Sequence, residues 1–233
     1  MLDDNNLRMK KIFFVLVGVC ALALASCSGN KQEAKEESQE NEQYHINYSE
    51  KSHINKEHKR VVIISAATRK GGNTDLLCDE FARGAKEAGG DVEKIFLGDY
   101  NIGYFSMADV QGDSAKAVKD DAPKLVEKLV DADIIVLSSP VYFMNITGQM
   151  KVFIDRTFSR YRDMKDKEFY YIVACADAEE STADCGITGL RGFVMCLPNP
   201  TERGYVKALG IRGLQDVKES KYMKEAYELG KKI

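Results

Sequence analysis

The chain has 233 residues, of which 44% are hydrophobic and 30% are charged, and its formal net charge is -3. A chain of this length and composition can bury one full core but hardly two large ones, so we expect a single folded domain. Without a basic surplus there is no source for the electrostatic attraction that drives non-specific nucleic-acid binding, so we expect no nucleic-acid partner.

The N-terminal residues have the pattern of a bacterial export signal. A basic segment over residues 8–11 precedes a mostly apolar run over 12–25, which is shorter than the roughly 20 apolar residues that a transmembrane helix needs. The run ends in Leu-Ala-Ser-Cys, which resembles the lipobox of bacterial lipoproteins. We therefore expect residues 1–27 to be a signal peptide and Cys27 to carry a lipid, giving a membrane-anchored periplasmic or outer-membrane lipoprotein of the cell envelope. An ordinary signal peptide with an incidental cysteine is the alternative.

Residues 28–59 are dominated by Lys, Glu, Gln, Asn and Ser and contain hardly any aliphatic side chains. Such a segment cannot bury enough apolar surface to offset the entropy that it would lose on ordering. We therefore expect a disordered polar tether here, and a folded domain over residues 60–233.

From residue 60 onwards, short apolar runs alternate with amphipathic stretches. The runs end at glycines or polar turns, as strands do, and the stretches between them have helical spacing. Residues 100–120 show no clean period and predict a long loop, which is usually functional or mobile. The expected strands are 60–66, 91–97, 133–138, 169–176 and 204–209, and the expected helices are 74–88, 122–132, a stretch ending near 160, 182–197 and 219–231.

Strands that are continuous apolar runs, rather than alternating ones, indicate a parallel sheet covered on both faces. We therefore expect an α/β fold with three layers. In such sheets, ligands bind outside the carboxyl ends of the strands, beside the point where the strand order reverses. The loops after the first, third and fourth strands should therefore converge on one site.

The loop after the first strand has the composition of a phosphate-binding site. It supplies hydroxyls, an amide, two glycines and two cations just before a helix, where backbone N–H groups and the helix dipole attract an anion. The G-x-G-x-x-G and Walker patterns are missing, and the hydroxyls suit a terminal phosphate better than a bridging pyrophosphate. An ordinary turn with a helix N-cap is the alternative. The candidate binding residues are Ser65, Thr68, Arg69, Lys70, Asn73 and Thr74.

Three stretches together resemble a known family, the flavodoxin-like NADPH-dependent FMN reductases and the related iron-sulfur flavoproteins. The stretches are 63–65 with 69–74, then 138–143, then Lys151 with 155–156, and the likeness runs from about Lys59 to the C-terminus. The resemblance implies a flavodoxin-like three-layer sandwich whose five-stranded parallel sheet has the order 2-1-3-4-5. It also implies FMN as cofactor, held by its phosphate at the first stretch and by its ring at the second.

The stretch after the third strand suits a flavin ring. Backbone amides of a stiff turn could bond to the pyrimidine edge and stabilise negative charge on the reduced ring, while an aromatic side chain flanks it. Core packing is the alternative for the aromatic residues. The candidates are Ser139, Pro140, Val141, Tyr142, Phe143 and Asn145, the last either as a ligand contact or as the cap of the next helix.

Two loops depart from the family pattern. Residues 102–110 lack the cysteine cluster that many relatives carry, so an iron-sulfur cluster in this loop is excluded. Tyr104, Phe105 and Met107 are expected to form either an apolar lid over the flavin or a hydrophobic subunit contact, which leaves a homodimer open. The loop over 175–181 is acidic, and we expect its carboxylates to face solvent or to cap the following helix.

The cysteines of the domain do not have the paired spacing of a metal site, and no metal is expected. Export to an oxidising compartment would permit a disulfide, for which Cys175 and Cys185 are the nearest pair. Cys78 and Cys196 are expected to be buried thiols on helix faces.

The resemblance implies an FMN-dependent oxidoreductase that passes electrons from a reduced donor to a quinone-like or other small acceptor. No catalytic side chain is assigned, because the cofactor performs the chemistry. Cytoplasmic relatives use NAD(P)H, which is not freely supplied outside the inner membrane, so an exported protein would need another donor or would have lost the reaction. The alternatives are a flavodoxin-like electron carrier and a flavin-free lipoprotein binding domain on the same scaffold.

Overall fold

The computed structural model describes residues 58–111 and 117–233. The expected signal peptide, Cys27 and nearly all of the expected tether lie outside the described residues. Within the described ranges, no helix is both long and apolar enough to cross a bilayer.

Five parallel strands form one sheet in the order β2-β1-β3-β4-β5, which confirms the expected order. Because the order reverses at β1, the central strands β1 and β3 lie side by side, paired from Val61–Ile134 to Ser65–Ser138. Their carboxyl ends therefore open next to each other, as a binding site at this edge requires. The strands are β1 (Arg60–Ser65), β2 (Asp91–Phe96), β3 (Ile134–Pro140), β4 (Glu168–Ala174) and β5 (Thr201–Ala208).

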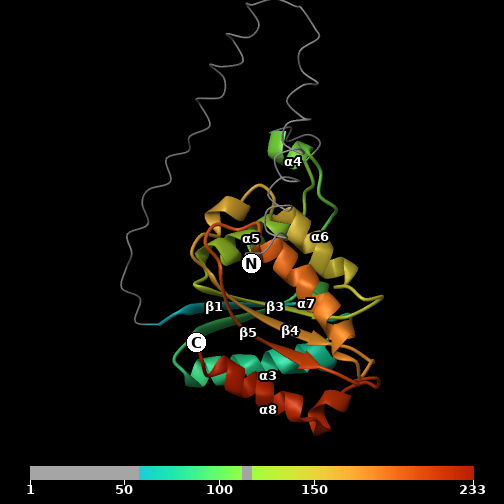
Figure 1. Ribbon diagram of the computed structural model, residues 1–233. Coiled ribbons are helices and arrows are strands. Elements are labelled where there is room, and N and C mark those ends of the chain that lie inside the picture. Colours follow the sequence, from blue (N-terminus) through green and yellow to red (C-terminus); the bar gives the residue numbers. More distant parts are fainter. Residues whose placement is uncertain (1–57, 112–116) are drawn as a thin grey trace, which may run out of the picture. The chain divides into compact units, whose positions relative to one another are not determined.

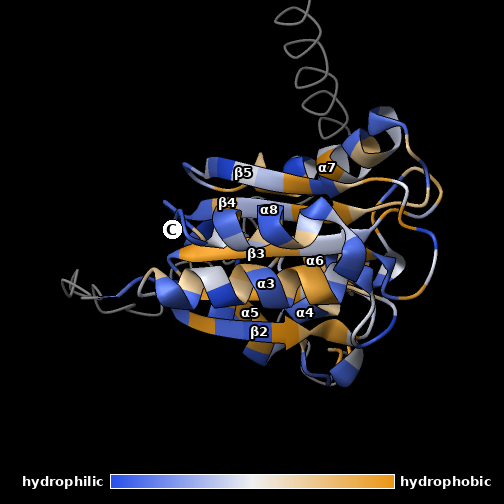
Figure 2. Cartoon of the chain, turned by 90° about the horizontal axis from the view of Figure 1, so that it is seen from below, coloured by the Kyte–Doolittle hydropathy of each residue, from blue (hydrophilic) through white to orange (hydrophobic). Residues whose placement is uncertain are grey.

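Helices cover both faces of the sheet, which confirms the three-layer α/β architecture. One face carries α3 (Asn73–Glu87) and α8 (Lys221–Gly230), which lie side by side (Figures 1 and 2). The other face carries α5 (Ala122–Asp131), α6 (Gly148–Arg156) and α7 (Glu180–Val194) (Figure 1). Shorter segments are α4 (Ala108–Gln111), η1 (Leu97–Asp99), η2 (Tyr161–Asp163) and η3 (Asp216–Glu219).

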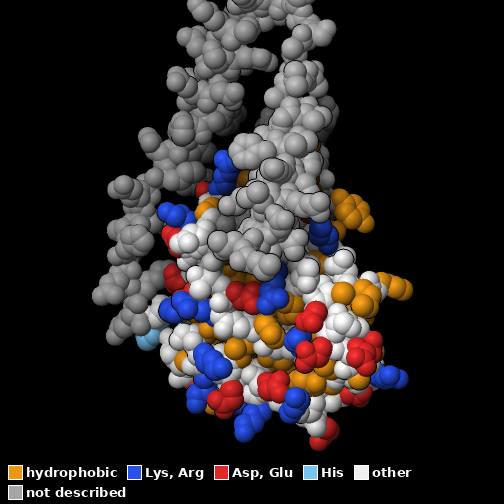
Figure 3. Space-filling view, viewed as in Figure 1, with side chains coloured by type: hydrophobic (Ala, Val, Ile, Leu, Met, Phe, Trp, Pro, Cys, Tyr) orange, Lys and Arg blue, Asp and Glu red, His pale blue; other side chains and the backbone are white. Residues whose placement is uncertain are grey.

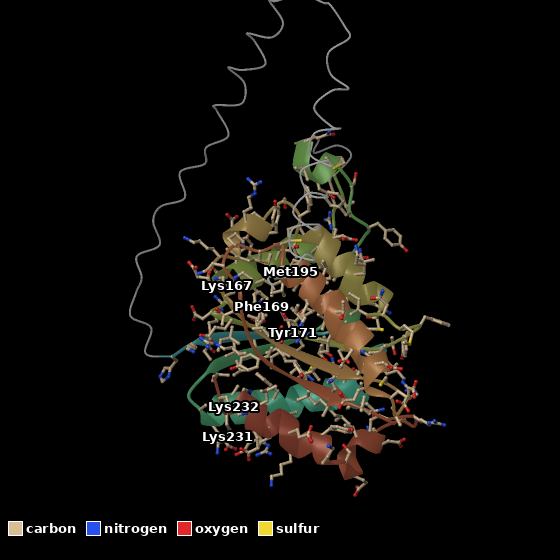
Figure 4. All side chains as sticks on the ribbon, viewed as in Figure 1. Lys167, Phe169, Tyr171, Met195, Lys231 and Lys232 are labelled. Carbon is tan, nitrogen blue, oxygen red and sulfur yellow. The ribbon has the colours of Figure 1, made fainter. Side chains whose placement is uncertain are left out.

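Alternate residues of each central strand point into two different cores. Val61 and Ile63 pack with α3 and α8, whereas Val62 and Ile64 pack with α5, α6 and α7. All four side chains are fully buried. Two buried faces explain why the strand reads as a continuous apolar run rather than as an alternating one. Phe169 and Tyr171 of β4 belong to the second core, below α7 in Figure 4.

The helices α3 and α8 approach each other closely at two glycines. A Cβ on Gly84 would collide with the carbonyl oxygen of Tyr227, and a Cβ on Gly230 would collide with that of Phe81. This backbone contact holds α3 against α8 in the C-terminal half of α3, away from the loop that precedes α3. Beyond α8, Lys231 and Lys232 lie far from that loop, near the edge where the strands begin (Figure 4).

Several element boundaries differ from expectation by two or more residues. β3 continues to Pro140, β5 begins three residues earlier at Thr201, and α6 ends at Arg156 rather than near residue 160. β4 ends at residue 174 rather than 176, and α7 ends at residue 194 rather than 197. The expected loop over 100–120 contains α4, and Arg156 explains how it is held. The Arg156 guanidinium is almost fully buried and forms ion pairs with Asp109 and Asp120. The last residue of α6 thus holds the segment around α4 against the domain.

Four cysteines lie in the described residues, and all are free thiols. Cys175 and Cys185 therefore do not form the disulfide that the sequence left open. Cys78 is buried as expected, and burial raises the pKa of its thiol to about 12, which makes it unreactive. The expectation for Cys196 is wrong, since this residue is exposed. It lies in the turn after α7, where Leu197 takes the buried position instead.

Candidate functional site

The loops after β1 and β3 meet at the carboxyl edge of the sheet. The hydroxyls of Thr68 and Tyr142 are 3.1 Å apart and share a hydrogen bond. The Thr147 hydroxyl, which precedes α6, donates to the Ala66 carbonyl at 3.3 Å. The expected convergence of these two segments is confirmed, so one ligand can touch both.

The loop after β1 leaves a group of backbone donors without acceptors. Among the described residues, none accepts a hydrogen bond from the first amides of this loop. The first amides of α3 are unpaired too, because the N-cap residue is Gly72, which has no side chain to cap them. A helix N-terminus with unpaired amides favours an anion. The amides concerned are those of Thr68, Arg69, Lys70, Asn73 and Thr74.

Two glycines allow the loop its shape. Gly71 has a φ of +70°, a conformation that other residues adopt only with strain. A Cβ on Gly72 would lie 2.9 Å from the Arg69 carbonyl oxygen. Any larger residue at either position would distort the turn that carries the unpaired amides.

A buried carboxylate holds the inner side of this loop. Asp75 is 2% exposed, and it accepts hydrogen bonds from the Ser65 hydroxyl and the Gly71 amide, each at 2.8 Å. Lys94 of β2 contributes a third bond at 3.1 Å. Burial alone would raise the pKa of Asp75, but these three bonds hold it below its ordinary value. The carboxylate is therefore ionised at neutral pH.

The outer side of the loop presents three exposed side chains, those of Thr68, Arg69 and Lys70. Lys70 is 2.5 Å from Asp99, so its charge is already paired. Arg69 has no ion-pair partner in the described part of the chain. Of the two candidate cations, Arg69 is the one that can offer its full charge to an anion.

Three of the candidate residues in this loop are placed differently from the expectation. The Ser65 hydroxyl is fully buried and committed to Asp75, so it shapes the loop from inside. Asn73 donates to the Gly213 carbonyl at 2.8 Å and accepts from the Val217 amide at 3.3 Å, which ties α3 to the segment after β5. Thr74 is 2% exposed, so it can serve a ligand through its backbone amide.

The loop after β3 is a tight two-residue hairpin. Tyr142 and Asn145 exchange two backbone hydrogen bonds, at 2.9 and 3.0 Å. Phe143 and Met144 between them have φ values of 50° and 60°. Left-handed conformations cost non-glycine residues about 1–2 kcal/mol each, and such strain clusters at functional sites.

The hairpin presents apolar surface to solvent. Tyr142 is 48% exposed, Phe143 is fully exposed and Met144 is 51% exposed. Apolar side chains protrude at the right-hand side of Figure 3, the side toward which the strand arrows of Figure 1 point. The side chains of this loop are therefore available to a flat apolar ligand.

The inner residues of the same loop are used internally. The Ser139 hydroxyl accepts from the Thr147 amide and donates to the Pro140 carbonyl, both at 2.9 Å. The Val141 amide donates to Ala174, and the Tyr142 amide is taken by the hairpin. The expectation that amides of 139–142 face a ligand is therefore wrong for these bonds, since strand pairing and the hairpin already use them.

The expected alternative of Asn145 as a helix cap is also wrong. Thr147 is the N-cap of α6, and its hydroxyl accepts from the Met150 amide. Asn145 is exposed and its side-chain oxygen accepts from the Ile146 amide. Its side-chain amide nitrogen has no hydrogen-bond partner in the described part of the chain.

The acidic loop after β4 behaves as expected. The carboxylate of Asp177 accepts from the Thr182 hydroxyl at 2.8 Å and from the Glu179 amide at 3.2 Å, and these bonds lower its pKa. Glu180 pairs with Lys207. These charges are thus engaged at the start of α7. Within the described residues, no group of three or more His, Cys, Asp or Glu side chains could hold a metal ion.

Sequence patterns did not reveal the roles of Asp75, Lys94 and Thr147. The role of Lys94 could have been predicted, because Lys94 shares one face of its strand with Val92 and Phe96 and so places a charge on an apolar face. A carboxylate early in a helix, by contrast, usually serves only the helix dipole. Thr147 followed by an apolar helical face has the pattern of an N-cap.

Comparison with known proteins gives a consistent result. A family model described as NADPH-dependent FMN reductase matches residues 59–184, more than half of the chain. YwqN of Bacillus subtilis, provisionally described as an NAD(P)H-dependent FMN-containing oxidoreductase, is 31% identical over 111 residues, covering 47% of this chain and 58% of its own. An iron-sulfur flavoprotein of Archaeoglobus fulgidus is 33% identical over 98 residues, covering 42% of this chain and 44% of its own. The chain spans about half the length of the curated relatives it matches.

A solved structure shows the same fold. It is the NAD(P)H:quinone oxidoreductase from Methanothermobacter marburgensis, which superposes with a TM-score of 0.59 over 75% of this chain and 95% of its own. The sequence identity is 16%, so this likeness concerns the fold alone.

Proposed function

Because this chain belongs to the NADPH-dependent FMN reductase family, we propose that it is an FMN-dependent oxidoreductase that passes electrons from a reduced donor to a quinone-like or other small acceptor. The observation that carries the proposal is the hydrogen bond between Thr68 and Tyr142. It joins a loop of unpaired amides to a hairpin of exposed aromatic side chains. FMN combines a phosphate with a flat ring, so its two ends match the two loops.

The residues present fit this cofactor. The amides of residues 68–70, 73 and 74 would hold the phosphate, and Arg69 would add charge. Tyr142, Phe143 and the Asn145 amide would contact the ring. Bound FMN supplies reversible electron transfer, which none of the side chains provides. The protein's part is to bind and orient the cofactor and to shield it from water.

Titration of the purified protein with FMN tests the proposal. We expect the fluorescence of FMN to be quenched on binding, and the loaded protein to oxidise NADPH or NADH with a benzoquinone as acceptor. A quinol should be tested as donor in parallel, because an exported protein meets little NAD(P)H. Binding without turnover of any donor would favour an electron carrier, and absence of binding would contradict the proposal.

We further propose that Cys27 is lipidated and anchors the protein to a membrane of the cell envelope. The support is the basic and apolar pattern that ends in the Leu-Ala-Ser-Cys motif. In cells fed a labelled fatty acid, the protein should acquire label and fractionate with membranes, and Cys27→Ala should lose both properties. An unlabelled, soluble wild-type protein would contradict this assignment.

A further inference from the structure

Asp75 is an unexpected residue at a phosphate-binding loop. Its carboxylate lies in the first turn of α3, bonded directly to the Gly71 amide of that loop. Two negative charges a few ångströms apart repel, and they do so more strongly at a partly buried site. An ionised carboxylate here should therefore weaken the binding of a phosphate unless another charge compensates it.

Lys94 supplies that charge from a different element. Its ammonium lies 3.1 Å from Asp75 and 2.5 Å from Asp79. The lysine side chain is only 23% exposed, because it stands beside Ile63 on the face of the sheet that α3 covers. Asp79 is 51% exposed, so water screens its carboxylate, whereas the buried carboxylate of Asp75 depends on Lys94 for compensation.

The Asp75 carboxylate also accepts two hydrogen bonds that a neutral apolar residue could not accept. The donors are the Gly71 amide and the Ser65 hydroxyl. The amides of residues 68–70 before Gly71, and of residues 73 and 74 after it, have no acceptor in the described part of the chain, whereas the Gly72 amide donates to the Arg69 carbonyl. Asp75 thus sets the shape of the loop, and Lys94 sets its charge.

We propose that Asp75 and Lys94 form a positioning pair, in which Asp75 holds the loop after β1 in its phosphate-binding shape and Lys94 cancels the charge that would otherwise repel the phosphate. The proposal rests on the proposed function. It predicts that Lys94 matters for FMN, which carries the phosphate, and not for riboflavin, which has the same ring without it.

Affinities for FMN and riboflavin, measured by fluorescence quenching on the full chain, test this pair. Lys94→Met should weaken FMN binding about tenfold and riboflavin binding less than twofold. Asp75→Asn combined with Lys94→Met should restore most of the FMN affinity, because the neutral amide can still accept from Gly71 and the one carboxylate that then lacks Lys94, Asp79, is largely solvated. Lys128→Met is the matched control, since it removes a lysine paired with Glu93 on the opposite face of the same strand, and it should change neither affinity.

Each result has one meaning. Equal losses of FMN and riboflavin affinity in Lys94→Met would show a merely structural role and overturn the proposal, as would unchanged FMN binding. Failure of the double variant to recover FMN binding, while it still binds riboflavin, would also overturn it. If the unmodified protein binds neither flavin, the proposed function itself fails, and the pair with it.

Discussion

The loops after β1 and β3 meet at one edge of the sheet, but they are built on opposite principles. Buried polar side chains hold the first loop from inside, above all Asp75, and its outer face is left with unpaired amides and Arg69. Backbone hydrogen bonds hold the second loop, and its outer face is apolar and strained. One loop offers donors and charge, whereas the other offers apolar surface. A ligand with a phosphate at one end and a flat ring at the other satisfies both.

The largest expected effect concerns the support of the first loop. Asp75→Ala leaves the Gly71 amide and the buried Ser65 hydroxyl without their acceptor, so it should lower the free energy of unfolding by about 2–3 kcal/mol. Asp79→Ala removes a mostly exposed partner of the same lysine, and its cost should stay within about 0.5 kcal/mol. Urea unfolding monitored by circular dichroism measures both. Equal costs for the two variants would mean that Asp75 does not support the loop.

The Asp75 contribution should depend on pH in one direction. The pKa of Asp75 is below its ordinary value of 3.8 in the folded protein, so the unfolded state takes up the proton first as the pH falls. The stability difference between wild type and Asp75→Ala should therefore be full at pH 7 and shrink below about pH 4. A difference that grows on acidification would contradict the hydrogen bonding assigned to this carboxylate.

A substitution of Phe143 tests whether the second loop contacts the flavin ring. Phe143→Asn replaces a fully exposed ring in a left-handed conformation with a residue that tolerates this conformation better. Stability should be unchanged or slightly higher, while FMN and riboflavin should both bind about three- to tenfold more weakly. A loss confined to FMN would place the hairpin at the phosphate instead of the ring.

The two neighbouring cations of the first loop should differ. Arg69→Ala should weaken FMN binding about three- to fivefold at low ionic strength, with less effect at high salt. Lys70→Ala should have less than half of this effect, because Lys70 is already paired with Asp99. The FMN affinities of both variants, measured at two salt concentrations, test this difference. A larger loss for Lys70→Ala than for Arg69→Ala would show that Lys70 leaves Asp99 to bind the ligand.

The smallest expected effect is that of the bond between the loops. Tyr142→Phe keeps the ring and removes the hydroxyl that meets Thr68. Because this bond is exposed, we expect only about a two- to threefold loss of affinity for both flavins. Thr68→Val removes the other partner, and the double variant should lose no more than either single one. Additive losses would indicate that each hydroxyl binds the ligand separately.

The fold was predictable because its signals are local. Continuous apolar runs identified the buried strands, and the glycines and polar turns marked where they end. Boundaries were less predictable where tertiary contacts decide them. Arg156 illustrates this, since its buried pairs with Asp109 and Asp120 hold a distant segment that has no helical or strand period of its own.

The candidate site was predictable in place but not in detail. The convergence of the two loops followed from strand order alone. Strand order does not predict which groups of each loop bond within the protein and which stay free for a ligand, because this depends on partners far along the chain. Asn73 bonds to Gly213 and Val217, and Asp75 meets Lys94 only once β2 lies beside β1. A hydroxyl or an amide in a loop thus predicts hydrogen bonding, but not whether a ligand or the protein receives it.

A shared flavin site requires that one ligand contact both loops. Chemical shifts of backbone amides, recorded while FMN and then riboflavin are added to isotope-labelled protein, measure this directly. FMN should shift amides in both 68–74 and 142–145, whereas riboflavin should shift mainly those in 142–145. Shifts confined to one loop with FMN, or the same pattern with both flavins, would contradict the shared site.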